Sequence, residues 1–385
     1  MRRTDYLPFG RPDFTDAEID AVTRVIRSGW VGMGPETIAF EKELTAFFGA
    51  GDVVTVSSCS AALFLSLRVL GIGPGDEVIC PSLTWCSSAN AAKFLGAEVV
   101  FCDVDAETLC VTARTVAPHL TERTRAVIVV HFGGLPADIT AIRAGLPDHV
   151  ALVEDAAHAL PARFADGSRV GASENLTCFS FYANKNLSTG EGGAIAVRDA
   201  AVARRLRSLR LHGLDADAWA RYSQKNTIVA AAPLSELGYK MNYTDLQASL
   251  GRVQLRRLAS LQKRRADIAQ CYVERLPDAL DGVRFQAGVL EERHARHLFL
   301  VLLPEHLRGA PRQQLIRALR EENIGVAVHY MPLHLMPLYG PSASLPVTED
   351  IAERVLTLPI SASMDLGDAQ SVVDAISRIA TGSLS

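Results

Sequence analysis

The sequence predicts an α/β protein, and two observations lead to that fold class. Short apolar runs rich in Val and Ile recur between residues 53 and 197 and alternate with helical patterns. Runs of this length that lack a polar face are typical of buried strands in a mainly parallel, doubly wound sheet. From about residue 243 the pattern changes to one long helix followed by shorter elements, which indicates a smaller α+β part.

The elements follow in order along the chain. Thr15 and Glu18 have capping-box spacing at the start of a first helix that ends near Ser28, and a second helix is expected from Pro35 to Gly49. The strand candidates of the large sheet lie at 53–58, 77–82, 98–104, 126–132, 150–156, 177–183 and 193–197. The second part has a helix over 244–276, a strand at 297–304, a helix near 312–322, a strand at 325–330 and terminal helices. We therefore expect an N-terminal segment and large domain over 1–245 and a small domain over 246–385.

The bulk composition limits the class of partner. A chain of 385 residues suits two domains, and a net charge of -4 without a basic run gives no reason to expect nucleic acid or an anionic membrane surface. No apolar stretch reaches the length of a membrane span, and the first residues do not read as a signal peptide. Seven scattered cysteines without a CxxC pair fit a reduced cytoplasmic chain without a metal site. The expected partners are small molecules.

Lys185 is the first candidate functional residue. It stands between the apolar strand candidate 177–183 and the glycine-rich run STGEGG at 188–193. A partly desolvated lysine has a lowered pKa and an amine that can attack a carbonyl to form a Schiff base. The alternative is an ordinary solvated loop lysine, so the neighbouring motifs have to distinguish the two.

The segment VEDAAHAL supplies two further candidates. Asp155 stands at the carboxyl end of a strand candidate, where ligands bind in open α/β sheets, and a carboxylate there can keep a pyridine nitrogen protonated. His158 follows one helical turn later and can face the same ring. A helix-capping aspartate and a core histidine are the alternatives.

A turn rich in hydroxyl groups precedes the helical pattern SAALFLSL. Ser58, Cys59 and Ser60 occupy this strand-to-helix turn, whose free backbone amides suit a phosphate group. Ser180, in the strand that leads to Lys185, can add a hydroxyl. The alternatives are plain helix capping for the turn and an ordinary sheet position for Ser180.

Two more residues complete the set of candidates. Trp85 follows a strand candidate among small residues and can stack on a flat cofactor, or else fill the core. Asn242, at the head of the long helix, can reach a phosphate of its own or of a neighbouring subunit, or else form a turn. A lysine, a strand-end carboxylate, an anion-binding turn and a stacking aromatic residue together indicate pyridoxal 5'-phosphate as the cofactor.

With these motifs the chain is identified as a member of the DegT/DnrJ/EryC1/StrS family of pyridoxal-phosphate enzymes, chiefly sugar aminotransferases. The resemblance covers nearly the whole chain and includes SGWVGMGPETIAFEKEL, PSLTWCSSANA, VEDAAHA, FSFYANKNLSTGEGG, LGYKMNYTDLQASLGRVQL and HYMPLHLMPLY. It implies fold type I, with a mainly parallel seven-stranded sheet in the large domain.

The resemblance also implies a role for each candidate. Lys185 would form the Schiff base with the cofactor and shuttle the proton, while Asp155 would pair with the pyridine nitrogen. Trp85 would stack on the ring and His158 would lie near its phenolic oxygen. The phosphate would be held by the turn residues and by one strand hydroxyl, namely Ser58, Cys59, Ser60 and Ser180.

One motif departs from the family, and one residue implies an assembly. At the phosphate turn the family usually has Ser-Gly-Thr, where this chain has Ser58, Cys59 and Ser60, but backbone amides can do the same work. Asn242 would reach the phosphate of the neighbouring subunit, which implies a homodimer with shared active sites.

The implied reaction moves an amino group from an amino acid, with L-glutamate expected, to a keto sugar. A nucleotide-linked keto sugar in amino-sugar or antibiotic biosynthesis is the first expectation, and a ketocyclitol of an aminoglycoside-type pathway is the alternative. Sugar dehydratases of the family carry histidine in place of Lys185, which argues against that activity. Lys185 and Asp155 together argue against a non-catalytic regulatory relative. His329 lies in a block near the family's active site, and its role is left open.

Overall fold

The large sheet has seven strands in the order β1-β7-β6-β5-β4-β2-β3 in the computed structural model, which describes residues 3–214, 234, 236–340 and 343–383. Each of the seven strand candidates forms one of them: β1 (Asp52–Val56), β2 (Glu77–Pro81), β3 (Glu98–Cys102), β4 (Thr124–Val130), β5 (Ala151–Asp155), β6 (Leu176–Ser180) and β7 (Gly193–Val197). Only β7 runs antiparallel to its neighbours β1 and β6. The predicted fold class, a mainly parallel α/β sheet, is confirmed.

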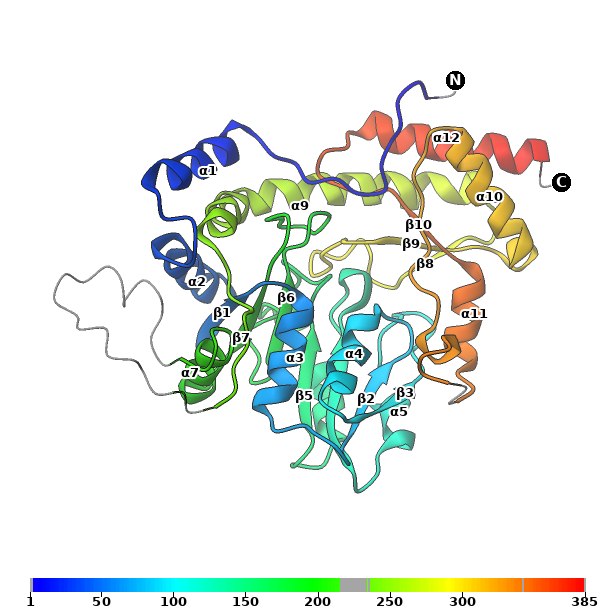
Figure 1. Ribbon diagram of the computed structural model, residues 1–385. Helices are drawn as coiled ribbons and strands as arrows, with labels where there is room; N and C mark the ends of the chain where they lie inside the picture. The colour runs from blue at the N-terminus through cyan, green and yellow to red at the C-terminus, as the bar shows by residue number, and fades with distance from the viewer. Residues whose placement is uncertain (1–2, 215–233, 235, 341–342, 384–385) are drawn as a thin grey trace.

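Helices cover the sheet and join it to the C-terminal part. Near the sheet lie α2 (Pro35–Phe48), α3 (Cys59–Val69), α4 (Cys86–Phe94), α5 (Ala113–Val116), α6 (Ile139–Ala144) and α7 (Ala200–Leu209). Figure 1 shows α3 and α4 side by side, and α3 packs across β5, β6 and β7. Successive residues of β6 and β7 are all buried, so both faces of these strands are covered, as their uniform apolar sequences require.

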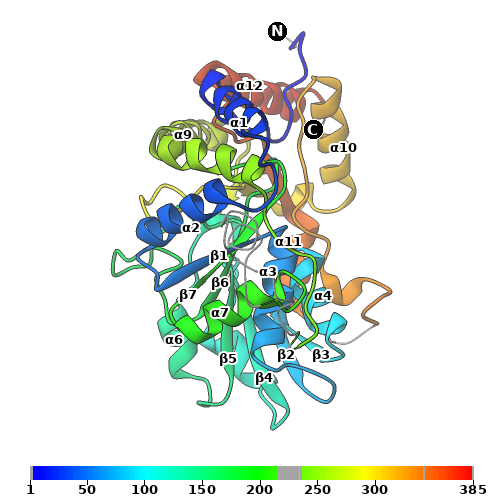
Figure 2. The same ribbon diagram turned by 60° about the vertical axis from the view of Figure 1, so that its left-hand side comes forward.

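The helix α9 (Asp245–Ala279) connects the two parts of the molecule. Its first turn is closed by a capping box in which the Thr244 side chain accepts from the Gln247 backbone amide. In Figures 1 and 2 this helix runs past α1 (Asp16–Ser28) and α2, and farther along its length it packs on α12 (Leu366–Ser383). A domain boundary at residue 245 stays a prediction. In the part of the chain that the structure describes, no helix combines the length and the apolar character needed to cross a membrane.

The C-terminal part contains a small antiparallel sheet in the order β10-β9-β8. Its strands and helices are β8 (Arg284–Phe285), β9 (Phe299–Leu302), β10 (Val355–Leu358), α10 (Ala310–Glu321) and α11 (Pro346–Arg354). The strand expected at 325–330 is wrong: within this segment only Ala327 forms a bridge, to Thr357, and the following residues His329 and Tyr330 line a cavity. The strand β9 pairs with β8 on one side and with β10 on the other, and the sequence analysis did not predict β10.

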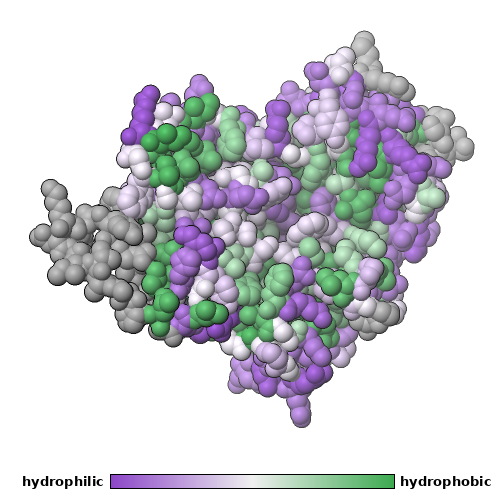
Figure 3. Space-filling view, viewed as in Figure 1, coloured by the Kyte–Doolittle hydropathy of each residue, from purple (hydrophilic) through white to green (hydrophobic). Residues whose placement is uncertain are grey.

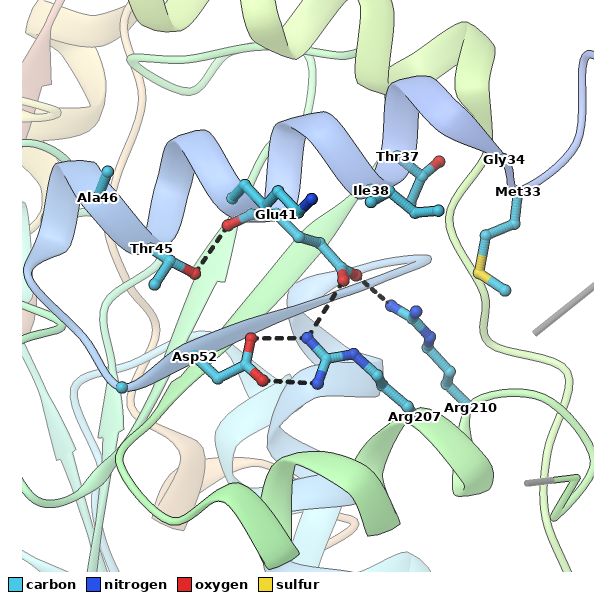
Figure 4. Close-up of a pocket in the computed structure, with 12 residues that line it drawn as sticks. Met33, Gly34, Thr37, Ile38, Glu41, Thr45, Ala46, Asp52, Arg207 and Arg210 are labelled. Atoms are coloured by element: carbon cyan, nitrogen blue, oxygen red, sulfur yellow. Dashed lines mark hydrogen bonds and ion pairs between the residues drawn. The ribbon is translucent and has the colours of Figure 1, made fainter. Parts of the chain in front are cut away.

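The outer edge of the large sheet at β1 is covered by charged side chains (Figure 4). The Thr55 backbone amide donates to Glu41 Oε1 at 2.9 Å, and Arg210 Nη1 donates to the Thr55 carbonyl at 2.6 Å. Arg210 also pairs with Glu41, while Arg207 makes two 2.6 Å contacts with Asp52. The cluster lies beside a cavity of about 550 Å³ and satisfies edge groups that would otherwise be free to pair with another strand.

Some apolar side chains remain uncovered on the surface of the chain. Figure 3 shows a hydrophobic patch over α1, where Ile19 is 61% and Ile26 is 59% exposed. The opposite side of this helix packs on α9 through Ala21 and Val25. The helix is therefore apolar on more than the face that it buries within this chain, which is typical of a surface that meets another molecule.

Candidate active site

The predicted site residues meet in a cavity of about 430 Å³ at the carboxyl ends of β5 and β6. This is the edge of an open α/β sheet at which ligands bind. All of the predicted residues except Asn242 line this cavity: Ser58, Cys59, Ser60, Trp85, Asp155, His158, Ser180 and Lys185. Ser58 and Lys185, which are 127 positions apart in the sequence, thus line the same cavity.

Lys185 lies in a loop whose two ends are tied together. Ser180 at the end of β6 is paired with Gly193 at the start of β7. The Phe181 amide donates to the Gly192 carbonyl at 2.9 Å, and the Thr189 amide donates to the Phe181 carbonyl at 2.9 Å. The antiparallel orientation of β7 thus brings the chain straight back to the site and fixes where the lysine side chain starts.

Burial shifts the protonation of the Lys185 amine. Desolvation lowers the pKa of Lys185 to about 8, although the nearby Cys59 and Asp155 act in the opposite direction. Arg265 adds a repulsion that lowers the pKa further. A larger fraction of this amine is therefore neutral at physiological pH than for an ordinary lysine, and a neutral amine is the nucleophilic form.

Asp155 is held by hydrogen bonds from two elements. Its Oδ2 accepts from the Ser88 hydroxyl of α4 at 2.7 Å, and its Oδ1 accepts from the Ala157 amide at 3.1 Å. Ser88 is fully buried and lies 3.2 Å from the Thr84 hydroxyl. Sequence reasoning missed Ser88, because only the packing of α4 against the end of β5 gives this serine a partner.

The turn before α3 has the form of an anion-binding site. The Ser58 hydroxyl accepts from the Ala61 amide at 3.1 Å, so its side chain caps the helix, and the backbone amides of Cys59 and Ser60 begin the first turn. Gly193 lies directly against this turn, since a Cβ atom there would be 2.5 Å from the Ser58 carbonyl carbon. Only glycine permits this approach of β7 to the head of the helix.

The remaining cavity wall is aromatic. His158 Nε2 lies 3.4 Å from the Tyr330 hydroxyl, and its buried Nδ1 has no hydrogen-bond partner among the residues that the structure describes. Burial, with Lys185 and His329 nearby, holds the pKa of His158 well below its usual value, so the ring is neutral. The Trp85 ring lies 5.8 Å from that of Tyr330 and is 60% exposed, so Trp85 does not fill the core.

Three residues of the site or its surroundings were not predicted with a role. Tyr330 and His329 line the cavity, and His329 Nδ1 lies 2.8 Å from the Thr357 hydroxyl. His297 lies behind Lys185, with its Nε2 3.3 Å from the lysine Nζ. The histidine at the head of the strand candidate HLFLVLLP was the available signal, but a sequence does not reveal which loop such a residue meets.

Asn242 lies outside the cavity of its own chain. Its Nδ2 donates to the Tyr243 carbonyl at 3.0 Å, and the side chain is half-buried. Its reach to a neighbouring subunit therefore stays a prediction.

Comparison with known proteins agrees with this geometry. The model of the DegT/DnrJ/EryC1/StrS aminotransferase family matches residues 12–377. The chain is 41% identical, over 99% of both sequences, to the spore coat polysaccharide biosynthesis protein SpsC of Bacillus subtilis. It is 36% identical to the aminotransferase TlmJ from Streptoalloteichus hindustanus, with a TM-score of 0.88 and coverage of 99% and 100%. It is 29% identical to the putative sugar aminotransferase Spr1654 from Streptococcus pneumoniae in its PLP form, with a TM-score of 0.88 and coverage of 98% and 99%.

Proposed function

Because this chain belongs to the DegT/DnrJ/EryC1/StrS aminotransferase family and is an aminotransferase that uses pyridoxal 5'-phosphate, we propose that it aminates a keto sugar with L-glutamate as the donor. The proposed acceptor is a nucleotide-linked keto sugar of amino-sugar or secondary-metabolite biosynthesis. SpsC acts in polysaccharide biosynthesis, and Spr1654 is described as a putative sugar aminotransferase, which supports an acceptor of the sugar class. The observation that carries the proposal is the amine of Lys185 beside Asp155 in one cavity.

The residues present fit the cofactor. The turn at Ser58 presents the backbone amides that begin α3, which suit a phosphate, and Gly193 leaves room for the backbone to approach. The Nδ1 of the buried His158, which has no partner within the described part of the chain, is available to a polar atom of a ligand. The exposed face of Trp85 is available for stacking. When bound, the cofactor supplies an electron sink that makes the substrate C–H bond acidic.

We assign the proton-carrying role to Lys185. Its Nζ would take up and give up one proton within each half-reaction: it would remove the proton from Cα of the donor amino acid in the first half and deliver one to the former keto carbon of the acceptor in the second. A pKa of about 8 is well matched to both directions of transfer. Asp155 holds the positive charge on the ring nitrogen, and Ser88 keeps that carboxylate oriented through the 2.7 Å hydrogen bond. The turn of Ser58, Cys59 and Ser60, with Ser180, binds the phosphate.

The first experiment tests Lys185 directly. The wild-type protein is incubated with pyridoxal phosphate and borohydride, and the modified peptide is identified by mass spectrometry. We expect attachment at Lys185, no attachment and no transamination in Lys185→Ala, and normal behaviour in Lys93→Ala, since Lys93 is an exposed residue of α4. Retained transamination by Lys185→Ala would show that the assignment is wrong.

The second experiment tests donor and acceptor. L-glutamate is expected to shift the absorbance of the bound cofactor, and an unchanged spectrum would exclude it as donor. A panel of nucleotide-linked keto sugars and ketocyclitols is then offered to the aminated enzyme. Turnover of the ketocyclitols alone would replace the nucleotide sugar by the alternative acceptor.

We also propose that the enzyme is a homodimer with shared sites, in which Asn242 contacts the phosphate bound by its partner. The exposed apolar side chains on α1 and the exposed Trp85 at the cavity wall support a covering subunit. Lys185→Ala and Asn242→Ala are mixed at a cofactor concentration at which neither is active alone. A heterodimer restores one complete site, so the mixture should regain activity. A mixture that exchanges subunits and remains inactive would contradict shared sites.

A further inference from the structure

A chain of buried polar groups runs from the Lys185 amine through His297 to Asn186. Lys185 Nζ lies 3.3 Å from His297 Nε2, and His297 Nδ1 lies 3.3 Å from Asn186 Oδ1. His297 is only 4% and Asn186 only 6% exposed. His297 enters from the loop before β9, so it joins the C-terminal part of the chain to the lysine loop.

The orientation of the Asn186 amide is fixed by two backbone carbonyl groups. Asn186 Nδ2 donates to the Leu160 carbonyl at 2.9 Å and to the Ala295 carbonyl at 2.7 Å. A flipped amide would place Oδ1 against both carbonyl oxygens, with no proton between any of the three. Asn186 therefore presents its Oδ1, which can only accept, to the imidazole of His297.

This acceptor selects one tautomer of His297. Burial holds the pKa of His297 well below its usual value, and Lys185, His158, Arg265 and His329 all act in the same direction, so the ring is neutral. A neutral imidazole carries one N–H group. Because Nδ1 faces the acceptor Asn186 Oδ1, the proton lies on Nδ1. The lone pair of Nε2 is then directed toward the amine of Lys185.

We propose that His297 is a positioning residue whose Nε2 accepts a hydrogen bond from the Lys185 amine whenever that amine is not bonded to the cofactor, and that Asn186 fixes the tautomer required. The inference rests on the proposed role of Lys185. A released lysine side chain has many accessible rotamers, most of which would place the amine away from the reacting carbon. The His297 acceptor keeps the amine beside the cavity during each half-reaction.

The first test uses the cofactor-free protein and does not depend on turnover. Long-range ¹H–¹⁵N NMR of histidine-labelled protein identifies the His297 signals by their loss in His297→Gln. We expect the Nδ1–H tautomer in the wild type and a loss of this preference in Asn186→Leu. A wild-type Nε2–H tautomer would overturn the proposal, even if Lys185 proves essential for transamination.

The second test measures the reductive methylation rate of Lys185 in the cofactor-free protein by mass spectrometry, with Lys93 as an internal control. An acceptor stabilises the ammonium form more than the neutral amine. His297→Phe should therefore raise the rate about three- to tenfold at pH 7, but not at pH 10, where both proteins carry the neutral amine. His297→Gln keeps an oxygen acceptor in reach and should stay within about twofold of the wild type.

A merely structural role for His297 predicts a different pattern. Both variants would then change stability to a similar extent, and the pH profile of Lys185 methylation would keep its wild-type midpoint. Such a result in folded variants would overturn the proposal. If His297→Phe does not fold, the wild-type tautomer and its loss in Asn186→Leu still decide. Loss of transamination in Lys185→Ala is a separate result that bears only on the proposed function.

Discussion

Glu41 lies at the centre of the charged cluster that covers the β1 edge, and its replacement by Gln is expected to destabilise the protein markedly. The carboxylate accepts from the amide and the hydroxyl of Thr55, at 2.9 and 2.7 Å, and pairs with Arg210 and Arg207. Arg210 is only 4% exposed. A neutral glutamine would remove the direct ion-pair partner of the buried Arg210, and the carboxylate of Asp52 is already bonded to Arg207.

The magnitude follows from the burial of the pair. Removing one partner of a buried ion pair costs about 3 to 5 kcal/mol. For 385 residues the entropy of unfolding near the melting temperature is about 0.8 kcal/mol/K, so the expected fall in Tm is about 4 to 6 °C. The exposed pair Lys263–Asp267, whose side chains are 75% and 46% exposed, provides the control, and Lys263→Gln should shift Tm by less than about 1 °C.

The pH dependence gives this prediction a sign. Burial alone raises the pKa of Glu41, but Arg210 and Arg207 outweigh it and hold the pKa below its usual value. The stabilisation is therefore complete above the unfolded-state value of about 4.3 and is lost as the pH falls through the lower folded-state value. Calorimetric melting of the wild-type and Glu41→Gln proteins from pH 7 downward should show a difference in Tm that narrows only in acid. A difference below about 1 °C at pH 7 would refute the reasoning.

Three further predictions concern the active site. Gly193→Ala should raise the dissociation constant of the cofactor at least about tenfold, because the new methyl group overlaps the turn before α3. The control Gly73→Ala places its methyl group in open space and should leave the constant unchanged. Equal affinities of the Gly193→Ala and wild-type proteins in a spectroscopic titration would contradict this prediction. Ser88→Ala should lower kcat about 10- to 100-fold by removing the hydrogen bond to Asp155, and a kcat within twofold of the wild type in a coupled assay would argue against that role. Methylation of Lys185 in the cofactor-free protein should have its midpoint near pH 8, whereas exposed lysines of the same chain titrate near about 10.4, and a Lys185 midpoint above pH 10 would show that burial has little effect.

The strands of the large sheet could be predicted from the sequence because each is a short apolar run. A run of that length is too short for a buried helix. The sequence was insufficient at 325–330, where the run GVAVHY has the composition of a strand but only Ala327 bridges to Thr357. A pattern reports which residues prefer burial, and both a strand and a cavity wall satisfy that preference. Where the sequence predicted a strand, Tyr330 and His329 line the cavity instead.

The residues of the candidate site that could be predicted are those that stand at or just after the ends of strands. Asp155 and Lys185 were identifiable because the carboxyl ends of parallel strands share one edge. Ser88 and His297 were not, since each obtains its role from a partner far along the chain: Ser88 meets Asp155 across 67 positions and His297 meets Lys185 across 112. Such contacts depend on how helices and loops pack on the sheet, which local patterns do not encode.

The closed base of the Lys185 loop has a consequence for how the chemistry of this scaffold can change. Because Ser180 is paired with Gly193 and Phe181 bonds to Gly192, the strands hold both ends of the loop whatever side chain stands between them. A substitution at position 185 therefore alters the reacting group without asking the sheet to refold around it. If the proposed role of Lys185 is correct, the reaction could change through this one position at a small structural cost, while the turn proposed to bind the phosphate stays in place.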